Sequence, residues 1–368
     1  MSEPSAAPPA GARVVAPIGC LFLPLLLLVC VAYYLLFASD LGIYDGEEGL
    51  WQLALNAHDH FIYLSTMERI RDTELLYEMN NDVGIALIYM ALSWFLPFLV
   101  DEDLALLALV FNSVTLVACW VSYASICHRL GLGTGGKLSF FANLSLIYFA
   151  QLINKDMLTV LSFLLAVQLG LAGRRWQLLL LVPFLALVRQ QLALFMLMFV
   201  FLMWARRPVP RMVFLYVVTS LVAAFLSIFA AVIEPESLGD GFSAFLIGIN
   251  QQFYVGYLLL NPVRVLQYVA DAYASFWPAT DTGGIDAAKV LRWPQLLLLL
   301  FLARPLSTMV TRFRHWLDTP ARALVLVVVA YLLAWLMNPT INARYVMLIT
   351  PVLVLFALYA KRQLRAQP

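Results

Sequence analysis

Long apolar runs alternate with short polar stretches along the whole chain. About ten of these runs favour membrane-crossing helices, because one span needs roughly 20 apolar residues to cross about 30 Å of hydrocarbon. The predicted spans are 16–37, 104–127, 138–153, 157–173, 176–188, 192–205, 211–233, 291–303, 322–338 and 345–360. The sequence therefore predicts an all-α, polytopic integral membrane protein that forms one domain over residues 1–368.

A further apolar run, 84–100, lies between Asp82 and Asp101. If this run crossed the membrane, either the first helix would run from outside to inside or a basic loop would face outside. We interpret it as a partial or surface helix that Pro97 breaks. The alternative reverses the first helix and places 38–83 in the cytoplasm.

Composition supports the membrane class. Hydrophobic residues make up 63% of the chain, charged residues 12%, and the mean hydropathy is +0.86, which excludes an ordinary soluble domain. The net charge of +1 gives no case for nucleic acid as a partner. The four cysteines have no metal-ligand spacing and are interpreted as small core residues. The run 16–37 is expected to be a retained first helix with its N-terminus inside.

Charge fixes the expected topology. Basic clusters lie between the runs or after the last one: Arg129/Lys137, Arg174/Arg175, Arg206/Arg207/Arg211, Arg304 to Arg322 and Lys361/Arg362/Arg365. Placing them inside puts 15 of 23 Lys and Arg inside and 20 of 22 Asp and Glu outside. The basic bias obeys the positive-inside rule, whereas the acidic bias is not required by it. We therefore expect an integral protein of the bacterial inner (cytoplasmic) membrane, with an active site that faces the periplasm or exterior.

Two outer regions are long. Residues 38–83 form a first outer loop with ten acids, in which Leu50 to Arg71 is predicted to be an amphipathic surface helix. Its expected apolar face consists of Leu53, Phe61, Leu64, Met67 and Ile70. Residues 234–290 form a second outer loop whose aromatic residues suit a membrane interface or sugar stacking. These are Phe253, Tyr254, Tyr257, Tyr268, Tyr273, Phe276 and Trp277.

The first outer loop holds two acidic groups that could carry chemistry. Asp45 and Glu48 lie in the first group, Asp45-Gly46-Glu47-Glu48, and Asp59 lies in the second, His58-Asp59-His60. A carboxylate near the membrane surface can deprotonate a sugar hydroxyl, or hold a divalent metal on a phosphate. The alternative is a solvated loop whose acids only keep it outside. Adjacent residues of a helix do not share a face, which weakens His-Asp-His as a metal site.

Three later turns carry charge between apolar runs. Lys155 and Asp156 form a charged pair with almost no polar loop around it, and such a pair either has a function or caps a tight helical hairpin. Arg189 and Gln190 interrupt one apolar stretch, and Arg344-Tyr345 opens the last span. Arginine suits bidentate contact with a lipid phosphate, while the alternative for both arginines is snorkelling to the headgroups.

No P-loop, GxSxG, HExxH, dinucleotide fingerprint or CxxC is found. The layout nevertheless resembles a known superfamily through five short motifs. They are Asp59-His60-Phe61-Ile62-Tyr63-Leu64 in the first outer loop, Asn81-Asp82-Val83-Gly84 before the next apolar run, Lys155-Asp156, Arg189, and Arg344-Tyr345 followed by Pro351. This pattern is similar to GT-C glycosyltransferases that use polyprenyl-phosphate sugars. It also resembles bacterial O-antigen and exopolysaccharide polymerases of the Wzy and EpsG groups.

The resemblance implies roles for individual residues. Asp59 would be the first-loop base or a metal ligand, Asp156 the second acid, and Arg189 and Arg344 contacts to the lipid phosphate. Family members often have two prolines where this chain has Asp82-Val83, and Asp45-Gly46-Glu47-Glu48 resembles the Asp-Glu of other members. Asp45 or Glu48 therefore stays open as the alternative acid.

The implied partners are a polyprenyl-phosphate-linked sugar donor, a glycan or lipid acceptor and membrane lipids. The chemistry requires no ATP site and the pattern specifies no certain cofactor, while a divalent metal (Mg or Mn) on Asp59 or Asp156 is compatible with it. The expected function is a membrane glycosyltransferase of cell-envelope polysaccharide or glycolipid assembly. A polysaccharide polymerase is the nearest alternative, and a lipid-linked-glycan flippase or ion-coupled transporter is the alternative of another class.

Overall fold

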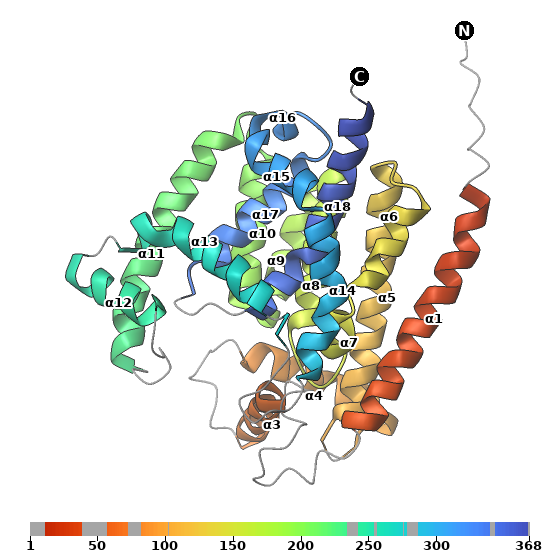
Figure 1. Cartoon of the computed structure of the whole chain (residues 1–368). Helices are drawn as coiled ribbons and strands as arrows, with labels where there is room; N and C mark the ends of the chain where they lie inside the picture. Colours follow the sequence, from red (N-terminus) through yellow and green to blue (C-terminus); the bar gives the residue numbers. More distant parts are fainter. Residues whose placement is uncertain are drawn as a thin grey trace.

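The computed structural model describes residues 12–38, 57–72, 82–101, 103–233, 242–253, 256–274, 276–277, 286–338 and 343–366. These residues form helices and contain no strand, so the all-α prediction is confirmed for them (Figure 1). The helices are α1 (Ala12–Phe37), α3 (Ala57–Arg71), α4 (Val83–Phe95), η2 (Pro97–Leu99), α5 (Ala105–Arg129), α6 (Thr134–Leu138), η3 (Ser139–Ala142), α7 (Ser145–Phe149), α8 (Asp156–Leu171), α9 (Arg175–Val188), α10 (Gln190–Met203), α11 (Pro208–Ile233), α12 (Phe242–Phe253), α13 (Gly256–Ala274), α14 (Ala287–Phe301), α15 (Ala303–Thr311), α16 (Phe313–Leu317), α17 (Arg322–Trp335) and α18 (Ala343–Ala366).

Three helices of the described part are long and apolar enough to cross a membrane: α5, the 208–226 part of α11, and 344–366 of α18. Helices α14 and α15 would add a fourth span as a pair, although they are bent by 61° at the break between them. Six further apolar helices have 10 to 17 residues. The model is thus compatible with a membrane protein, and the number of about ten spans stays a prediction.

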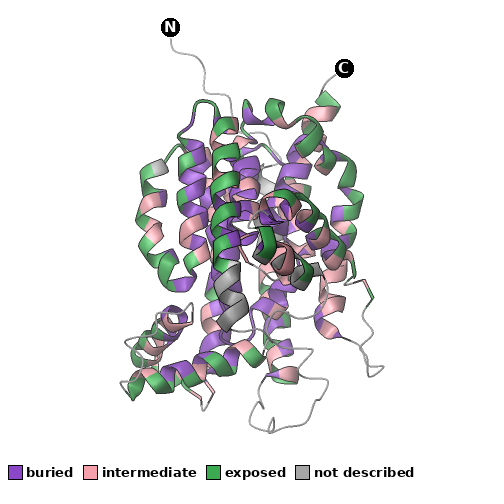
Figure 2. Ribbon diagram, turned by 90° about the vertical axis from the view of Figure 1, so that its left-hand side faces the viewer, coloured by how far each residue is buried: buried purple, intermediate pink, exposed green. Residues whose placement is uncertain are grey.

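The centre of the bundle is made by α5, α8, α10, α17 and α18. Phe163 of α8 contacts Phe195 of α10 and Trp335 of α17, with ring centroids 4.9 and 5.5 Å apart. All three side chains are buried. Figure 2 views the molecule from the side of α11 and α12, and the outward face of α11 is largely exposed. Val213, Phe214 and Phe225 are among its exposed residues, which is the pattern of a helix that contacts lipid tails.

The charged residues sort to the two ends of this bundle. Arg362 of α18 donates to the carbonyl oxygen of Leu130, just after α5, at 2.9 Å. Arg322, at the start of α17, donates to the carbonyl oxygen of Ala205, just after α10. The basic clusters of α5, α10, α17 and α18 are therefore neighbours at one end, here called the basic end. Helices α3 and α4 lie at the opposite end, beside the last residues of α1 (Figure 1).

The segment between α1 and α5 begins and ends at the end of the bundle opposite the basic end (Figure 1). Helix α4 has 13 residues and rises about 20 Å, which is less than the roughly 30 Å of a hydrocarbon core. The helix ends before Pro97, which begins the short helix η2. Helices α9, α10 and α17 have only one residue more, so length does not separate α4 from them, and our interpretation of 84–100 as a partial or surface helix stays a prediction.

The run 138–153 is not the continuous span that we expected. Three short helices, α6, η3 and α7, replace it over 134–149. Asn143 donates its side-chain amide to the carbonyl oxygens of Ser139 (3.3 Å) and Phe140 (2.8 Å), and the Ser139 hydroxyl donates to the carbonyl of Gly136 at 2.7 Å. Side-chain bonds of this kind give the backbone an alternative to the helical pattern.

Two expectations for the outer regions need correction. On α3 the face buried against the protein is formed by His60, Tyr63, Thr66 and Met67, whereas Phe61 is 41% exposed, so of these two apolar-face residues only Met67 packs against the bundle. Leu53 lies outside the described residues. In the second outer region Tyr257 and Tyr268 are buried against the bundle, while Phe253 and Trp277 are exposed as a membrane interface would require. Tyr254 lies outside the described residues.

Candidate functional site

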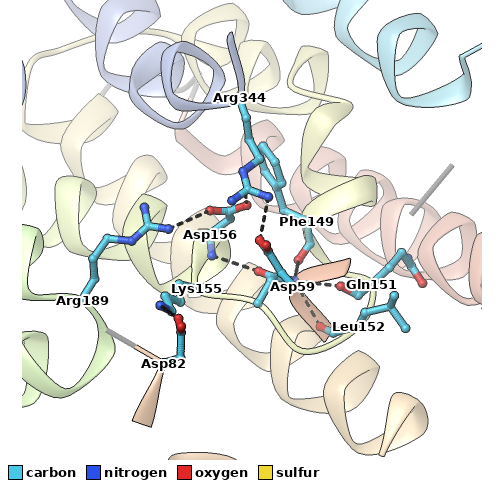
Figure 3. A network of polar contacts seen from close by, with 10 residues as sticks. Asp59, Asp82, Phe149, Gln151, Leu152, Lys155, Asp156, Arg189 and Arg344 are labelled. Carbon is cyan, nitrogen blue, oxygen red and sulfur yellow. Dashed lines mark hydrogen bonds and ion pairs between the residues drawn. The ribbon is translucent and has the colours of Figure 1, made fainter. Parts of the chain in front are cut away.

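Two carboxylates from distant parts of the chain meet on one arginine. Helix α3 presents Asp59, and Asp156 is the first residue of α8. Arg344, the second residue of α18, contacts the Asp59 carboxylate through Nη1 at 3.0 Å and the Asp156 carboxylate through Nε at 3.3 Å (Figure 3). The Asp156 side chain is 2% exposed and that of Asp59 is 27% exposed. The arrangement therefore has one buried acid, Asp156, and one partly exposed acid, Asp59.

Further cations surround this pair. Arg189, between α9 and α10, lies 3.9 Å from Asp156, and its guanidinium lies over the ring of Tyr345 at 5.6 Å. Lys155 donates to Asp82 at 2.7 Å and lies 5.2 Å from the ring centre of Tyr63.

Lys155 and Arg189 are almost completely buried. Burial lowers the pKa of Lys155, and its hydrogen bond with Asp82 opposes that shift. The site thus concentrates charge of both signs in a place with little solvent, where electrostatic interactions are strong.

The start of α8 lies partway along the bundle. The Cys119 thiol, in the middle of α5, contacts the carbonyl oxygen of Met157 at 4.0 Å, so α8 begins beside the middle of α5. From Ala105 to Cys119 the axis of α5 rises about 20 Å, at about 1.5 Å per residue. Asp156 therefore lies well inside the length of the longest neighbouring helix. A charged residue at such a depth is expected to have a function rather than a purely structural role.

The loop before α8 is held by the side chain of Asn154. Its amide nitrogen donates to the carbonyl oxygens of Phe149 (2.8 Å), Gln151 (2.7 Å) and Leu152 (3.1 Å). Its oxygen accepts the backbone N–H of Asp156 at 2.9 Å. This bond, together with the dipole of α8, satisfies the N-terminus of the helix and favours the negative charge of Asp156 there.

The same loop is fixed from two other helices. Asn112 of α5 donates to the carbonyl of Leu152 at 2.9 Å, and Leu152 has a positive φ of 56°. A left-handed leucine is strained and persists only where its surroundings determine the backbone. His60 of α3 accepts the backbone N–H of Ile153 through Nδ1 at 3.1 Å. Burial lowers the pKa of His60 to about 4, so this histidine is neutral near pH 7 and acts as an acceptor.

A close helix contact places the Lys155–Asp82 pair. Gly84, near the start of α4, packs against the end of α9: a Cβ added at Gly84 would lie 1.7 Å from the carbonyl oxygen of Leu187. Only glycine permits this approach. The contact brings Asp82, the residue before α4, close to the turn that carries Lys155.

Six of the residues predicted from sequence lie together here: Asp59, Lys155, Asp156, Arg189, Arg344 and Tyr345. Gln190 is exposed at the start of α10, whereas its neighbour Gln191 donates to the side chain of Asn338. Asp45 and Glu48 lie outside the described residues, so their role as the alternative acid stays a prediction.

Sequence reasoning missed several residues of this region. Arg292 of α14 lies within electrostatic reach of Arg344 and of Tyr148 in α7. Arg264 of α13 is fully buried and donates to the carbonyl oxygen of Leu336 at 2.6 Å, at the end of α17. Each of these arginines stands beside an apolar run of the sequence, and that position was the signal that could have marked it as a candidate.

The carboxylates do not fit a metal held by both of them. The Arg344 guanidinium contacts both Asp59 and Asp156 and so lies where a shared cation would bind. Among the described residues no group of three His, Cys, Asp or Glu side chains is arranged for a metal ion. The described cysteines, Cys30, Cys119 and Cys127, are buried and free, which confirms their interpretation as core residues. The side chain of Cys20 is outside the described part.

No protein-family model matches this sequence, and comparison with curated proteins and with solved structures gives no match.

Proposed function

We propose that this protein is a membrane glycosyltransferase that takes a sugar from a polyprenyl-phosphate donor at the outer face of the membrane. Its product would enter cell-envelope polysaccharide or glycolipid assembly. The observation that carries the proposal is the convergence of Asp59 and Asp156 on Arg344, away from the basic end of the bundle. We also propose that the shorter apolar helices other than α4 are further spans, which gives about ten spans in a bacterial inner membrane.

The site has the charges that such a transfer needs. An acceptor hydroxyl attacks the anomeric carbon, the bond from that carbon to the phosphate oxygen breaks, and the hydroxyl proton goes to a base. Asp59 is the more exposed acid and suits the role of base. Lys155, Arg189 and Arg344 form ion pairs with Asp82, Asp156 and Asp59, and these cations are suited to contact a lipid phosphate as well.

Ion pairing of Asp59 suggests how donor binding and base activation are linked. A donor phosphate would compete with the Asp59 carboxylate for the Arg344 guanidinium. Its binding would release that carboxylate to accept the proton of the acceptor. The buried partner, Asp156, would keep Arg344 in place during this exchange.

The test is transfer of sugar from a polyprenyl-phosphate donor by the full chain reconstituted in lipid vesicles. Asp59→Asn is expected to lower the rate by roughly 10²- to 10⁴-fold, the usual range for loss of a general base. Asp72→Asn is the matched control, because Asp72 is an exposed acid next to the end of the same helix. Full activity in an Asp59→Asn, Asp156→Asn double variant would contradict the role of these acids, and absence of transfer by the wild type would favour the transporter class.

Glycan analysis separates the two enzymatic alternatives. In cells that lack the protein, mass spectrometry of lipid-linked glycans is expected to show repeat units that are short of one sugar. Intact repeat units that remain unpolymerised would instead indicate a polysaccharide polymerase. Labelling of an Asp59→Cys variant from the outside tests the orientation, since exposure of this position only to the cytosol would contradict the outer-face site.

A further inference from the structure

A pocket lies at the basic end, between helices α14, α15 and α18 and away from the Asp59 site. It has a volume of about 810 Å³ and is formed by the end of α14, by α15 and by the end of α18. Helix α15 turns away from α14 by 61° and forms one wall, and α18 forms the other. None of the residues that line the pocket belongs to the network of Asp59, Asp156 and Arg344.

The lining of this pocket is strongly cationic. Arg304 and Arg312 come from the α15 side, and Lys361 and Arg365 come from α18. No aspartate or glutamate is among the lining residues. Thr308 and Thr311 add hydroxyl groups. Four cations that share one cavity with no carboxylate lining it form an electrostatic trap for an anion with more than one negative charge.

The helices that form the pocket also carry exposed apolar side chains. Phe301 lines it, is 74% exposed, and lies 4.8 Å from the Lys361 ammonium. Leu297 and Leu300 on α14 and Val310 on α15 are 57%, 49% and 80% exposed. A cationic cavity beside exposed apolar side chains fits an amphiphile whose anionic head enters the cavity and whose chains lie along the helices.

We propose that this pocket binds the headgroup of an anionic phospholipid with two phosphates, from the leaflet at the basic end. Two phosphodiester groups match four cations, because an arginine guanidinium holds phosphate oxygens in pairs. The positive-inside bias alone explains basic residues at this end, but it does not explain their gathering around one cavity. Arg206 and Arg207 obey the same bias, are exposed, and do not line the pocket. The proposal does not depend on the reaction at the Asp59 site.

The test uses the full chain purified in neutral detergent, with cardiolipin as the probe and native mass spectrometry as the readout. Wild-type protein is expected to retain cardiolipin, and an Arg304→Gln, Arg365→Gln double variant is expected to bind it about 30-fold more weakly. This follows from roughly fivefold per basic residue near an anionic lipid surface. Both side chains are exposed, so the variant should fold normally, which its thermal unfolding without lipid checks.

The matched control is an Arg206→Gln, Arg207→Gln double variant, which loses the same charge at the same end outside the pocket. It is expected to retain cardiolipin as the wild type does. Equal loss in both double variants would overturn the proposal in favour of general surface charge. Failure of the wild type to retain cardiolipin would also overturn it. So would tighter binding of inorganic pyrophosphate than of cardiolipin, since the ligand would then be a free phosphate compound.

Discussion

Replacing Arg344 with glutamine removes the cation that Asp59 and Asp156 share. The Asp59 contact is the shorter one, 3.0 Å against 3.3 Å, so distance alone ranks it first. Burial ranks the two pairs in the opposite order, because the side chain of Asp156 is 2% exposed and that of Asp59 is 27% exposed. Double-mutant cycles on the two pairs show which effect dominates.

The magnitudes favour burial. With an effective dielectric constant of about 20, Coulomb's law gives about 5 kcal/mol for either contact before desolvation is subtracted. Breaking a buried pair by removing one partner usually costs about 3–5 kcal/mol, whereas a solvated pair contributes about 0–1 kcal/mol. We therefore expect Arg344→Gln to lower the free energy of unfolding by about 3 kcal/mol, with Arg189 offsetting part of the loss at Asp156.

The assay is equilibrium unfolding of the purified chain in mixed detergent micelles, for single and double variants. The coupling energy between Arg344→Gln and Asp156→Asn is expected to be about 2 kcal/mol, and that between Arg344→Gln and Asp59→Asn less than about 1 kcal/mol. Arg69→Gln is the control, because Arg69 is an exposed arginine of α3 and should change stability by less than about 0.5 kcal/mol. A coupling to Asp59 as large as that to Asp156 would refute the reasoning from burial.

Three further predictions follow from the supports of the site. Gly84→Ala forces α4 away from the backbone of α9 and should destabilise the protein by more than about 2 kcal/mol, while Gly135→Ala, which meets no atom within 4 Å, should not. His60 has a pKa of about 4 in the fold against 6.5 ordinarily, so the unfolded chain takes up the proton first. The free energy of unfolding should therefore fall by about 3 kcal/mol in total as the pH drops from 6.5 toward 4. His60→Gln should remove this pH dependence, whereas the control His58→Gln should keep it. Unfolding measured at several pH values tests both expectations. Asn154→Ala leaves buried backbone groups without their hydrogen-bond partner, so it should lower the free energy of unfolding by about 3 kcal/mol and reduce sugar transfer. An unchanged free energy of unfolding would contradict the role of Asn154 in holding the loop.

Helix positions were largely predictable from the sequence because they depend on local composition. The predicted run 104–127 became α5 over 105–129, and 176–188 became α9 over 175–188. The prediction of one continuous span over 138–153 was wrong because the side chains of Ser139 and Asn143 donate hydrogen bonds to nearby carbonyl oxygens. Average hydropathy does not detect this competition with the helical backbone pattern. The face of α3 that packs against the protein could not be read from hydropathy, because it is set by the loop that His60 contacts.

The sequence by itself determined that this chain is helical and apolar, with most of its charge between the apolar runs, because hydropathy and charge act locally along a chain. It also marked Asp59, Asp156, Arg189 and Arg344 as candidates, since charge beside an apolar run is costly without a reason. Only the tertiary structure decided that Arg344 bridges Asp59, 285 residues away, and Asp156. That choice depends on helix packing, because the close contact at Gly84 and the bonds of Asn154 set where the turns lie. No local pattern encodes those distances.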